Sequence, residues 1–584
     1  MICLGISEDL FDAGVALCDG ETVVFATNEE RYTRRKNEGG FPRHALAGLF
    51  DYTGIDPADV DQIYVVGHMT PPFPVRLFPW LHYWLYDTRR SKQETWLKKL
   101  MDFAMFMTPV SHTSENSIMR KVTRPLLGPV TRRTLPKALR RIPIDFIEHH
   151  TAHAAGAWNF SGFGDALAVT ADGMGDGLSL SVSRCDHNSG VQRLWKAASR
   201  DSFGLFFEVL TEAFGFVPCR DEGKITGLAA SGDPARVKEP APFSLVDGRL
   251  KYTGPYGRRG VAWVQDELKS KYSREDISAW AQDLLETHIV EVARWWLEET
   301  GLRRLVVAGG VFANVKLNQR LHELDQVDGL FVLPNMGDGG LSLGAISAKR
   351  QVAPQRLRDV FWGEDYTDDA VEAALKRAGV SYERSEDPDG DVPGLLAEGH
   401  TVARFQGRME WGPRALGNRS ILVRTTDAAV VDRLNDQLDR SEFMPFAPAM
   451  LDEDAEAYLV APDPARHTAQ FMTVCFDCTE KMKRENPAVV HVDGTARAQL
   501  VAKDTNPTFH RILAEYKQRS GSSVVLNTSF NIHEEPIVRT PDEGIAAFLR
   551  AGLDYLSIGG FMVKARHVAV RPQGDPQALA PGGA

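Results

Sequence analysis

The chain has 584 residues, of which 43% are hydrophobic and 25% are charged, the composition of an ordinary soluble globular protein. This length predicts roughly two to four domains, and no run of residues approaches the roughly twenty apolar residues that cross a bilayer. No basic signal-peptide segment opens the sequence, and six scattered cysteines favour a reducing cytoplasm over a disulfide framework.

The net charge of −11 is unevenly distributed along the chain. Residues 71–143 hold 14 Lys and Arg against 4 Asp and Glu, among many large aromatic side chains. Such a segment is compatible with nucleic acid, but no recognition module is visible and the rest of the chain is acidic. We interpret it as an amphipathic helical insertion, which either packs on the main body or forms a wall of a site for a bulky substrate.

The chain opens with short apolar strands. Residues 2–6 and 22–26 read as strands, and Asp19-Gly20 between them is a hairpin signal. Residues 166–183 repeat this scheme of strand, acidic glycine turn and strand. The repetition predicts a duplicated α/β unit.

Residues 148–153 read Glu-His-His-Thr-Ala-His and open an alanine-rich segment. In a helix, His149 and His153 lie four residues apart on one face, where two imidazoles bind one divalent metal. The same spacing also occurs in structural histidine pairs. An acidic glycine loop at 172–177 follows an apolar strand, and a metal pair beside such a loop suggests chemistry on a nucleotide.

Two later strands end in glycine-rich turns, after a helix predicted over 277–300. One strand ends at Gly309 and Gly310, ahead of Asn314, where backbone can approach a ligand closely. The other leads to Asp338, which either serves a ligand or caps the following helix.

After a linker at 348–356, a new α/β pattern begins. Residues 406–420 combine Arg408, Arg414 and Arg419 with three glycines and a proline. Fixed guanidinium groups beside exposed backbone amides suit a phosphate or a carboxylate.

The most specific motif pairing is Gly412-Pro-Arg-Ala-Leu-Gly417 with Leu526-Asn-Thr-Ser-Phe-Asn531. Further motifs are the pair of histidines and the segments 28–36, 223–230, 307–311 and 493–499. Together they resemble the O-carbamoyltransferases of antibiotic and nodulation-factor biosynthesis, the NodU/CmcH family, over roughly residues 1–570.

The resemblance implies an α/β fold with two domains. Residues 1–350 would form a duplicated actin/hexokinase-like domain similar to the tRNA-modifying TsaD proteins. Residues 360–570 would form a YrdC-like α/β domain that binds carbamoyl phosphate. The composition of residues 571–584 predicts a disordered tail.

The resemblance also implies a reaction. Carbamoyl phosphate is handled in the C-terminal domain, and its carbamoyl unit passes to ATP to give carbamoyl adenylate and pyrophosphate. A small-molecule acceptor with a free hydroxyl then takes the carbamoyl group. The cofactors implied are Mg²⁺ and Fe²⁺, although imidazole and carboxylate ligands also suit zinc or manganese.

Several residues of this chain match the positions that serve the family's reaction. The metal ligands would be His149, His153 and Asp338, with Asp172 near the metal or its water. The nucleotide contacts would be Gly173, Lys224, Gly309, Gly310 and Asn314. The carbamoyl phosphate contacts would be Lys36, Arg414, Arg497 and Asn527. The arginines have a second interpretation, in which they pin the interface between domains.

The chain departs from the family's pattern at the base for the acceptor hydroxyl. Where many relatives carry His-Asp, this chain carries Phe11-Asp12. Activation of the hydroxyl is therefore assigned to Asp12, to the metal, to another histidine such as His44, or to the acceptor itself.

A second departure is in the anion site, where Leu438 and Met444 stand in place of a Lys and an Arg, with Arg440 as a substitute. The long insertion favours a large acceptor such as a macrolide, an ansamycin or a glycoside of these. Aminoglycosides and β-lactams stay open.

We expect no nucleic acid or membrane partner, and a homodimer is compatible with the sequence. Three alternative functions stay open at this point: a tRNA threonylcarbamoyl-type transferase, a non-catalytic nucleotide-binding protein and a sugar kinase.

Overall fold

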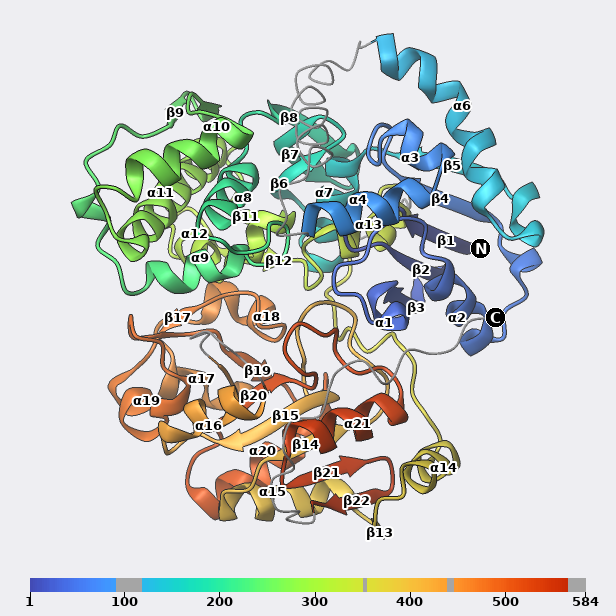
Figure 1. Ribbon diagram of the computed structural model, residues 1–584, viewed down its shortest axis with the longest axis vertical. Coiled ribbons are helices and arrows are strands. Elements are labelled where there is room, and N and C mark those ends of the chain that lie inside the picture. The colour runs from blue at the N-terminus through green and yellow to red at the C-terminus, as the bar shows by residue number, and fades with distance from the viewer. Residues whose placement is uncertain (91–117, 350–353, 439–445, 566–584) are drawn as a thin grey trace.

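The computed structural model describes residues 1–90, 118–349, 354–438 and 446–565. Figure 1 shows two lobes, an upper one with two five-stranded sheets and a lower one with one eight-stranded sheet. Among the helices of these segments, none combines the length and the apolar character that crossing a membrane requires.

The two sheets of the N-terminal lobe have the same strand order and the same arrangement of parallel and antiparallel strands. In each, three antiparallel strands joined by short turns pair with two parallel strands. The first sheet contains, in order, β3 (Thr22–Asn28), β2 (Gly14–Asp19), β1 (Ile2–Ser7), β4 (Gln62–Val66) and β5 (Ile144–Ile147). The second contains β8 (Gly190–Ala198), β7 (Leu178–Asp186), β6 (Ala166–Gly175), β11 (Arg304–Ala308) and β12 (Gly329–Val332). The repeated strand scheme expected from the sequence agrees with this topology.

Two helices lie between the sheets and cross at very short range. The helix α7 (His149–Ser161) packs on β6 and β11, whereas α13 (Leu341–Ser347) packs on β1, β2 and β4. A Cβ atom at Gly344 would lie 2.3 Å from the carbonyl oxygen of Ala152. Since no side chain fits in that gap, a glycine at position 344 is required for the crossing.

The strand β6 differs from the expected layout. The sequence predicted an acidic turn directly after a short strand, but β6 continues to Gly175 and the hairpin turn is Asp176-Gly177. The register between β6 and β7 shifts between Ala171 and Gly175. Such a bulge redirects side chains out of the sheet, and Asp172 lies within it.

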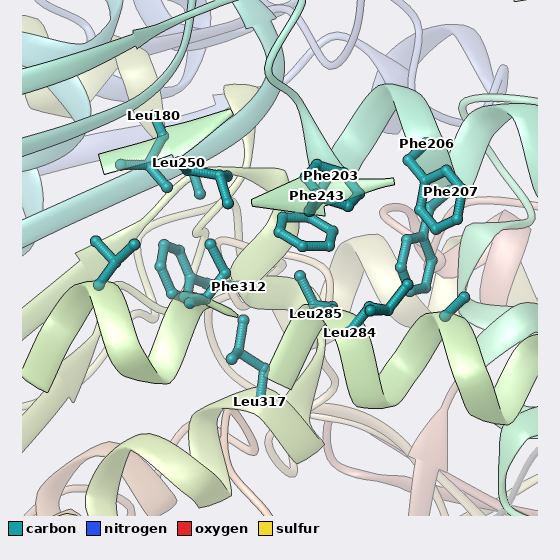
Figure 2. Packing of buried hydrophobic residues seen from close by; sticks show 14 of the residues in the cluster. Leu180, Phe203, Phe206, Phe207, Phe243, Leu250, Leu284, Leu285, Phe312 and Leu317 are labelled. Carbon is teal, nitrogen blue, oxygen red and sulfur yellow. The ribbon is translucent and has the colours of Figure 1, made fainter. Parts of the chain in front are cut away.

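A helical layer covers the outer side of the second sheet (Figure 1). It consists of α8 (Phe203–Ala213), α9 (Glu222–Ala229), α11 (Arg274–Thr300), α12 (Val315–His322) and the hairpin β9 (Phe243–Val246) and β10 (Arg249–Tyr252). Figure 2 shows its core, where Phe203 stacks on Phe243 with ring centroids 3.8 Å apart. The predicted helix over 277–300 is confirmed.

The C-terminal lobe is a mixed sheet with helices on both faces. Its strands are, in order, β13 (Glu383–Arg384), β22 (Phe561–Lys564), β21 (Tyr555–Ile558), β14 (Val402–Phe405), β15 (Arg419–Arg424), β20 (Val525–Ser529), β16 (Ala447–Leu451) and β19 (Gln499–Val501). Alternate residues of β14 and β15 pack in two separate clusters. One cluster includes α14 (Asp368–Ala378) and α21 (Pro541–Ala551), and the other includes α15 (Pro388–Glu398) and α20 (Pro507–Ser520).

The lobes are joined by buried contacts. On the N-terminal side, Arg31 donates to the carbonyl of Gly412 at 2.7 Å, and Asn318 donates to the carbonyl of Thr473 at 2.7 Å. One hydrophobic cluster also contains side chains from both lobes, among them Trp411 of the C-terminal one. This shared core holds the lobes in one arrangement.

The basic insertion is helical in the part that the structure describes. It contains α3 (Phe73–Leu77), α4 (Trp80–Arg90) and α6 (Ile118–Thr134). Its central residues 91–117 and the predicted tail at 571–584 lie outside the described residues.

The other helices and strands are short. They are α1 (Glu30–Thr33), α2 (Arg43–Thr53), α10 (Gly257–Ala262), α16 (Ala429–Gln437), α17 (Ala455–Tyr458), α18 (Arg466–Ala469), α19 (Glu480–Glu485), β17 (Phe476–Asp477) and β18 (Thr495–Ala496).

The buried ring of Phe312 offers a test of the core shown in Figure 2. Phe312 is fully buried beneath the turn that follows β11. We expect Phe312→Ala to lower the stability of the N-terminal lobe by about 3–5 kcal/mol, because it leaves a cavity in the hydrophobic core. Denaturant unfolding measures this loss, and Leu549→Ala on an exposed surface should change stability by less than about 0.5 kcal/mol. Equal effects of the two variants would contradict the packing.

Candidate metal and anion sites

Four side chains from three elements meet at the start of α7. The ligand atoms of His149, His153, Asp172 and Asp338 all lie within 4.8 Å of one another. His153 Nε2 is 3.2 Å from Asp172 Oδ2, and His149 Nε2 is 3.5 Å from Asp338 Oδ1. The sequence could not show that Asp172 is as close to the histidines as Asp338 is.

Local structure explains why these side chains converge. His149 and His153 lie on the first two turns of α7, and the carboxylate of Glu148 caps this helix by accepting from Thr151 N at 2.8 Å. Asp338 begins the 3₁₀ turn (Asp338–Gly340) that leads into α13. The crossing of α7 and α13 therefore brings His149 and Asp338 together, and the bulge in β6 adds Asp172.

Two further carboxylates orient His149. Asp9 Oδ2 lies 3.2 Å from His149 Nδ1, which leaves Nε2 directed at the cluster. Asp176 accepts from the backbone N–H of His149 at 3.0 Å and from those of His68, Met69 and Thr70 at 2.7 to 3.0 Å. A carboxylate behind a histidine is the usual support of a metal ligand.

The electrostatics of the cluster fit a bound cation. Burial and the neighbouring Asp172 and Asp9 raise the pKa of Asp338 to about 7. Burial alone would raise the pKa of Asp172, but the neighbouring imidazole rings of His149 and His153 hold it well below its ordinary value.

The buried atoms His149 Nε2 and Asp338 Oδ1 have no hydrogen-bond partner. Ligands about 2.1 Å from a shared ion lie roughly 3–3.5 Å apart, which matches the separations observed here. Two imidazoles and two carboxylates suit iron, manganese or zinc.

The third histidine of the motif has a different role. His150 Nδ1 lies 2.8 Å from the hydroxyl of Thr170, whose oxygen is 2.8 Å from that of Ser181. Burial, followed by the charge of His149, lowers the pKa of His150 to about 3. This histidine is therefore a neutral core residue.

One cavity connects this cluster with the C-terminal lobe. It has a volume of about 720 Å³ and is lined by residues of both lobes. Asp9, Asp172 and Asp338 lie on its wall in the N-terminal lobe, and Arg414 and Arg497 lie on its wall in the C-terminal lobe. Residues almost 500 positions apart thus line one cavity.

Arg414 and Arg497 are cations that have no counter-ion in the part of the chain that the structure describes. Among the residues that the structure describes, no carboxylate lies within ion-pair distance of either guanidinium, and the Nε atom of each is buried without a partner. Burial, and then the nearby charge of Arg497, lower the pKa of Arg414 well below its ordinary value. A pocket that holds two uncompensated guanidinium groups is suited to an anion.

A buried glutamate shapes the loop that carries Arg414. Glu410 Oε1 accepts backbone N–H groups of Leu416, Asn418 and Arg419 at 2.8 to 3.0 Å. The loop is thus held in one conformation by its own carboxylate.

The other two arginines of this segment serve the fold. Arg408 donates to the carbonyls of Val24 and Trp362 and so connects the lobes. Arg419 is fully buried, lies 3.7 Å from the centre of the Phe405 ring and donates only to backbone carbonyls. Of the three, Arg414 alone lines the cavity.

The structure brings some of the expected nucleotide residues together. Gly173, Gly310 and Asn314 line the cavity, and Asn314 also caps α12. Gly309 lies behind them, with a φ of 108° and space too small for a Cβ, which would meet the carbonyl oxygen of Ala171 at 2.1 Å. Lys224 is 3.4 Å from Asp221, and it does not line the cavity, whereas its neighbour Gly223 does.

Two expected carbamoyl phosphate contacts lie away from the cavity wall. Asn527 is buried and donates to Gln499 Oε1 at 2.8 Å and to the carbonyl of Ala415 at 3.3 Å, so it supports the loop beside Arg414. Lys36 is not part of the lining, to which the next residue, Asn37, contributes.

The structure distinguishes between the candidates for the base that activates the acceptor hydroxyl. Phe11 and Asp12 line the cavity, and burial together with the charge of Glu30 raises the pKa of Asp12 well above its ordinary value. His44 lies outside the lining and pairs with Glu29 at 2.6 Å.

The structure describes one of the two positions at which the anion site departs from the family's pattern. Leu438 is fully buried in the core of the C-terminal lobe. Arg440 and Met444 lie outside the described residues.

Sequence reasoning missed several residues of the wall. Asp9, Lys316, Cys475, His491 and Asp493 all line the cavity. The last two stand at the start of the segment that contains Arg497, so proximity to that motif was an available signal. Asp9, Lys316 and Cys475 carry no such signal, because the fold alone brings them to the site.

Comparison with known proteins covers both lobes. Residues 2–347 match the family described as "Carbamoyltransferase N-terminus", and residues 394–565 match "Carbamoyltransferase C-terminus".

Individual relatives agree with these matches. The nodulation protein NolNO of Sinorhizobium fredii is 32% identical over 97% of this chain and 83% of its own length. The 3'-hydroxymethylcephem-O-carbamoyltransferase of Streptomyces clavuligerus is 30% identical over 58% of this chain and 63% of its own length.

Among solved structures, the activator of 2-hydroxyisocaproyl-CoA dehydratase from Clostridium difficile aligns with 60% of this chain and 96% of its own. Its identity of 14% and TM-score of 0.33 are too low to support a conclusion about this chain.

Removal of the histidine ligands tests the metal cluster. We expect His149→Ala and His153→Ala each to lose bound divalent metal, because two carboxylates and one imidazole hold it far more weakly. Elemental analysis of the purified variants measures this loss. His150→Gln changes a buried histidine of the same helix and should keep its metal; equal retention in all three would refute the cluster.

The lack of a counter-ion at Arg414 predicts that this residue lowers the stability of the free protein and binds an anion. Without ligand, Arg414→Gln should raise the unfolding free energy by about 1 kcal/mol, because it removes a partly buried charge repelled by Arg497. Inorganic phosphate should raise the melting temperature of the unchanged protein and have little effect on the variant.

Arg419→Gln is the matched control for this experiment. It removes bonds to backbone carbonyls in the same loop and should destabilise the protein. A loss of stability in Arg414→Gln as large as in Arg419→Gln would show that Arg414 has a structural role.

Proposed function

The chain belongs to the carbamoyltransferase family, and from this premise we propose that it is an ATP-dependent O-carbamoyltransferase that uses carbamoyl phosphate. In this proposal water converts carbamoyl phosphate to carbamate and phosphate, and the carbamate oxygen attacks the α-phosphate of ATP to give carbamoyl adenylate and pyrophosphate. A small-molecule hydroxyl then accepts the carbamoyl group from the adenylate, and AMP leaves. The observation that carries the proposal is the cavity, which joins an uncompensated cationic pocket to a cluster of histidines and carboxylates.

The cationic pocket supports the use of carbamoyl phosphate. Arg414 and Arg497 offer donors and charge to the phosphate group. Phosphate leaves more readily when its developing charge is neutralised, so the same residues favour release of the carbamoyl unit. Because no carboxylate competes for them among the described side chains, an anionic ligand supplies the missing charge.

The shape of the cavity supports transfer inside the protein. Carbamate decomposes in water, and a carbamoyl unit released near Arg414 is sheltered on its way to the N-terminal lobe. The buried contacts between the lobes hold the two walls of the cavity in one arrangement.

At the other end of the cavity, backbone and small residues suit a nucleotide. Gly173 and Gly310 present main chain on the wall, and Asn314 adds an amide held by Gln282 at 2.7 Å. Glycine permits the close approach that a phosphate chain needs. We place the triphosphate of ATP, with Mg²⁺, between these residues and the cluster.

His149, His153, Asp172 and Asp338 would hold the resident metal, for which we propose Fe²⁺. A bound divalent metal supplies positive charge to phosphate oxygens and to the developing leaving group. Asp9 holds the imidazole of His149 by its Nδ1 atom, and so keeps Nε2 available for coordination.

The acceptor is expected beside Asp12, which lines the cavity together with Phe11 and lies close enough to Asp338 for that charge to affect its pKa. We propose Asp12 as the group that receives the proton of the acceptor hydroxyl. The surrounding wall includes Phe203, Phe207 and Met174, and this apolar lining supports a bulky natural product such as a macrolide or its glycoside.

The proposal extends to the two domains. We assign residues 1–350 to a TsaD-like domain for ATP and metal, and residues 360–570 to a YrdC-like domain for carbamoyl phosphate. The repeated topology of the two N-terminal sheets supports the first assignment.

The first half-reaction needs no knowledge of the acceptor. Purified protein with ATP, Mg²⁺, Fe²⁺ and carbamoyl phosphate should yield carbamoyl adenylate and pyrophosphate by mass spectrometry. Arg414→Gln should abolish formation of the adenylate, because its anion pocket has lost one of two cations. Formation of ADP would instead indicate a kinase, and bound ATP without any product would indicate a non-catalytic protein.

A further inference from the structure

A histidine that the mechanism has not yet used lies on the cavity wall beside the arginines. His491 is half-buried, lines the cavity and lies close enough to Arg497 for that charge to affect its titration. The strand residue Thr495 holds the turn behind it, since the backbone N–H of His491 donates to the carbonyl of Thr495 at 2.8 Å.

The hydrogen bonds behind the ring define which nitrogen carries the proton. The hydroxyl of Thr495 has a single proton, and it donates this proton to Asp493 Oδ1 at 2.7 Å. Asp493 is also paired with Lys316 at 3.0 Å and so stays an acceptor. The Thr495 oxygen, 3.4 Å from His491 Nδ1, must therefore accept from that nitrogen.

A proton on Nδ1 leaves a lone pair on Nε2 when the ring is neutral. Burial is the main reason that the pKa of His491 falls to about 4. The charge of Asp493 opposes this fall, whereas the charges of Arg497 and Lys316 add to it. The neutral ring therefore offers a hydrogen-bond acceptor at Nε2. It lies beside Arg414 and Arg497, whose guanidinium groups can only donate.

Carbamoyl phosphate needs such an acceptor. Its phosphate oxygens accept hydrogen bonds from guanidinium groups. Its amino group donates two hydrogen bonds, and an arginine has no acceptor for them. Acetyl phosphate has the same charge and nearly the same shape, with a methyl group in place of the amino group. Arginines alone cannot distinguish the two compounds.

We propose that His491 is the specificity residue of the anion pocket, accepting a hydrogen bond from the amino group of carbamoyl phosphate at Nε2 and so selecting it over acetyl phosphate. The inference rests on the proposed use of carbamoyl phosphate and identifies the group that recognises its amide. Acetyl phosphate would leave Nε2 facing a methyl group, and an unpaired buried acceptor weakens binding.

The test compares three ligands in one assay, which measures the formation of carbamoyl adenylate. The KM for carbamoyl phosphate is measured together with the inhibition constants of acetyl phosphate and of inorganic phosphate. In the unchanged protein, carbamoyl phosphate should bind about 10- to 100-fold more tightly than acetyl phosphate. His491→Phe should raise the KM by about this factor and leave both inhibition constants within about threefold.

His491→Gln is the rescue variant, because its side-chain carbonyl is an acceptor of similar reach, and it should recover part of the selectivity. Asn435→Ala is the matched control on the same wall and should leave the ratio unchanged. The inference is overturned if His491→Phe keeps the ratio, if it weakens all three compounds equally, or if Asn435→Ala removes the selectivity instead.

Failure of the proposed function gives a different result. In that case the unchanged protein forms no carbamoyl adenylate, while inorganic phosphate still stabilises it against heat through the two arginines. Loss of selectivity in His491→Phe is then not measurable by turnover, and equal stabilisation of the unchanged protein by carbamoyl phosphate and acetyl phosphate would refute the inference directly.

Discussion

The close crossing of α7 and α13 is the contact on which the site depends. Both helices lie between the two sheets of the N-terminal lobe; α7 begins at His149, and α13 directly follows the 3₁₀ turn that begins at Asp338. Because Gly344 allows the backbone of one helix to approach the carbonyl of Ala152 on the other, the first turns come close enough for His149 to meet Asp338. A side chain at position 344 would separate the helices and with them the ligands.

The second constraint is electrostatic, and it lies in the C-terminal lobe. Arg414 and Arg497 lie near each other with no carboxylate among the described residues to balance them. Such an arrangement costs stability, which the buried glutamate at position 410 and the shared core between the lobes offset. The proposed substrate supplies the missing charge, so the same feature that weakens the free protein strengthens its complex.

Much of the fold could be predicted because its signals are local. Strand periodicity and the Asp-Gly hairpin showed the repeated unit, and the four-residue spacing of His149 and His153 was readable as one face of a helix. The close approach of Asp172 was not, because it follows from a bulge that depends on pairing with β7. Arg408, Arg414 and Arg419 look equivalent in the sequence, and only tertiary contacts show that Arg414 alone reaches the cavity.

We propose that one cavity passes a carbamoyl unit from the arginines to the nucleotide. The most direct test supplies ¹³C-labelled carbamoyl phosphate together with ATP and a large excess of unlabelled carbamate from ammonium bicarbonate. Mass spectrometry then gives the isotopic composition of the carbamoyl adenylate. If transfer occurs inside the cavity, the adenylate keeps the full label. An adenylate diluted to the composition of the bulk carbamate would contradict the account, because the unit would have passed through solvent.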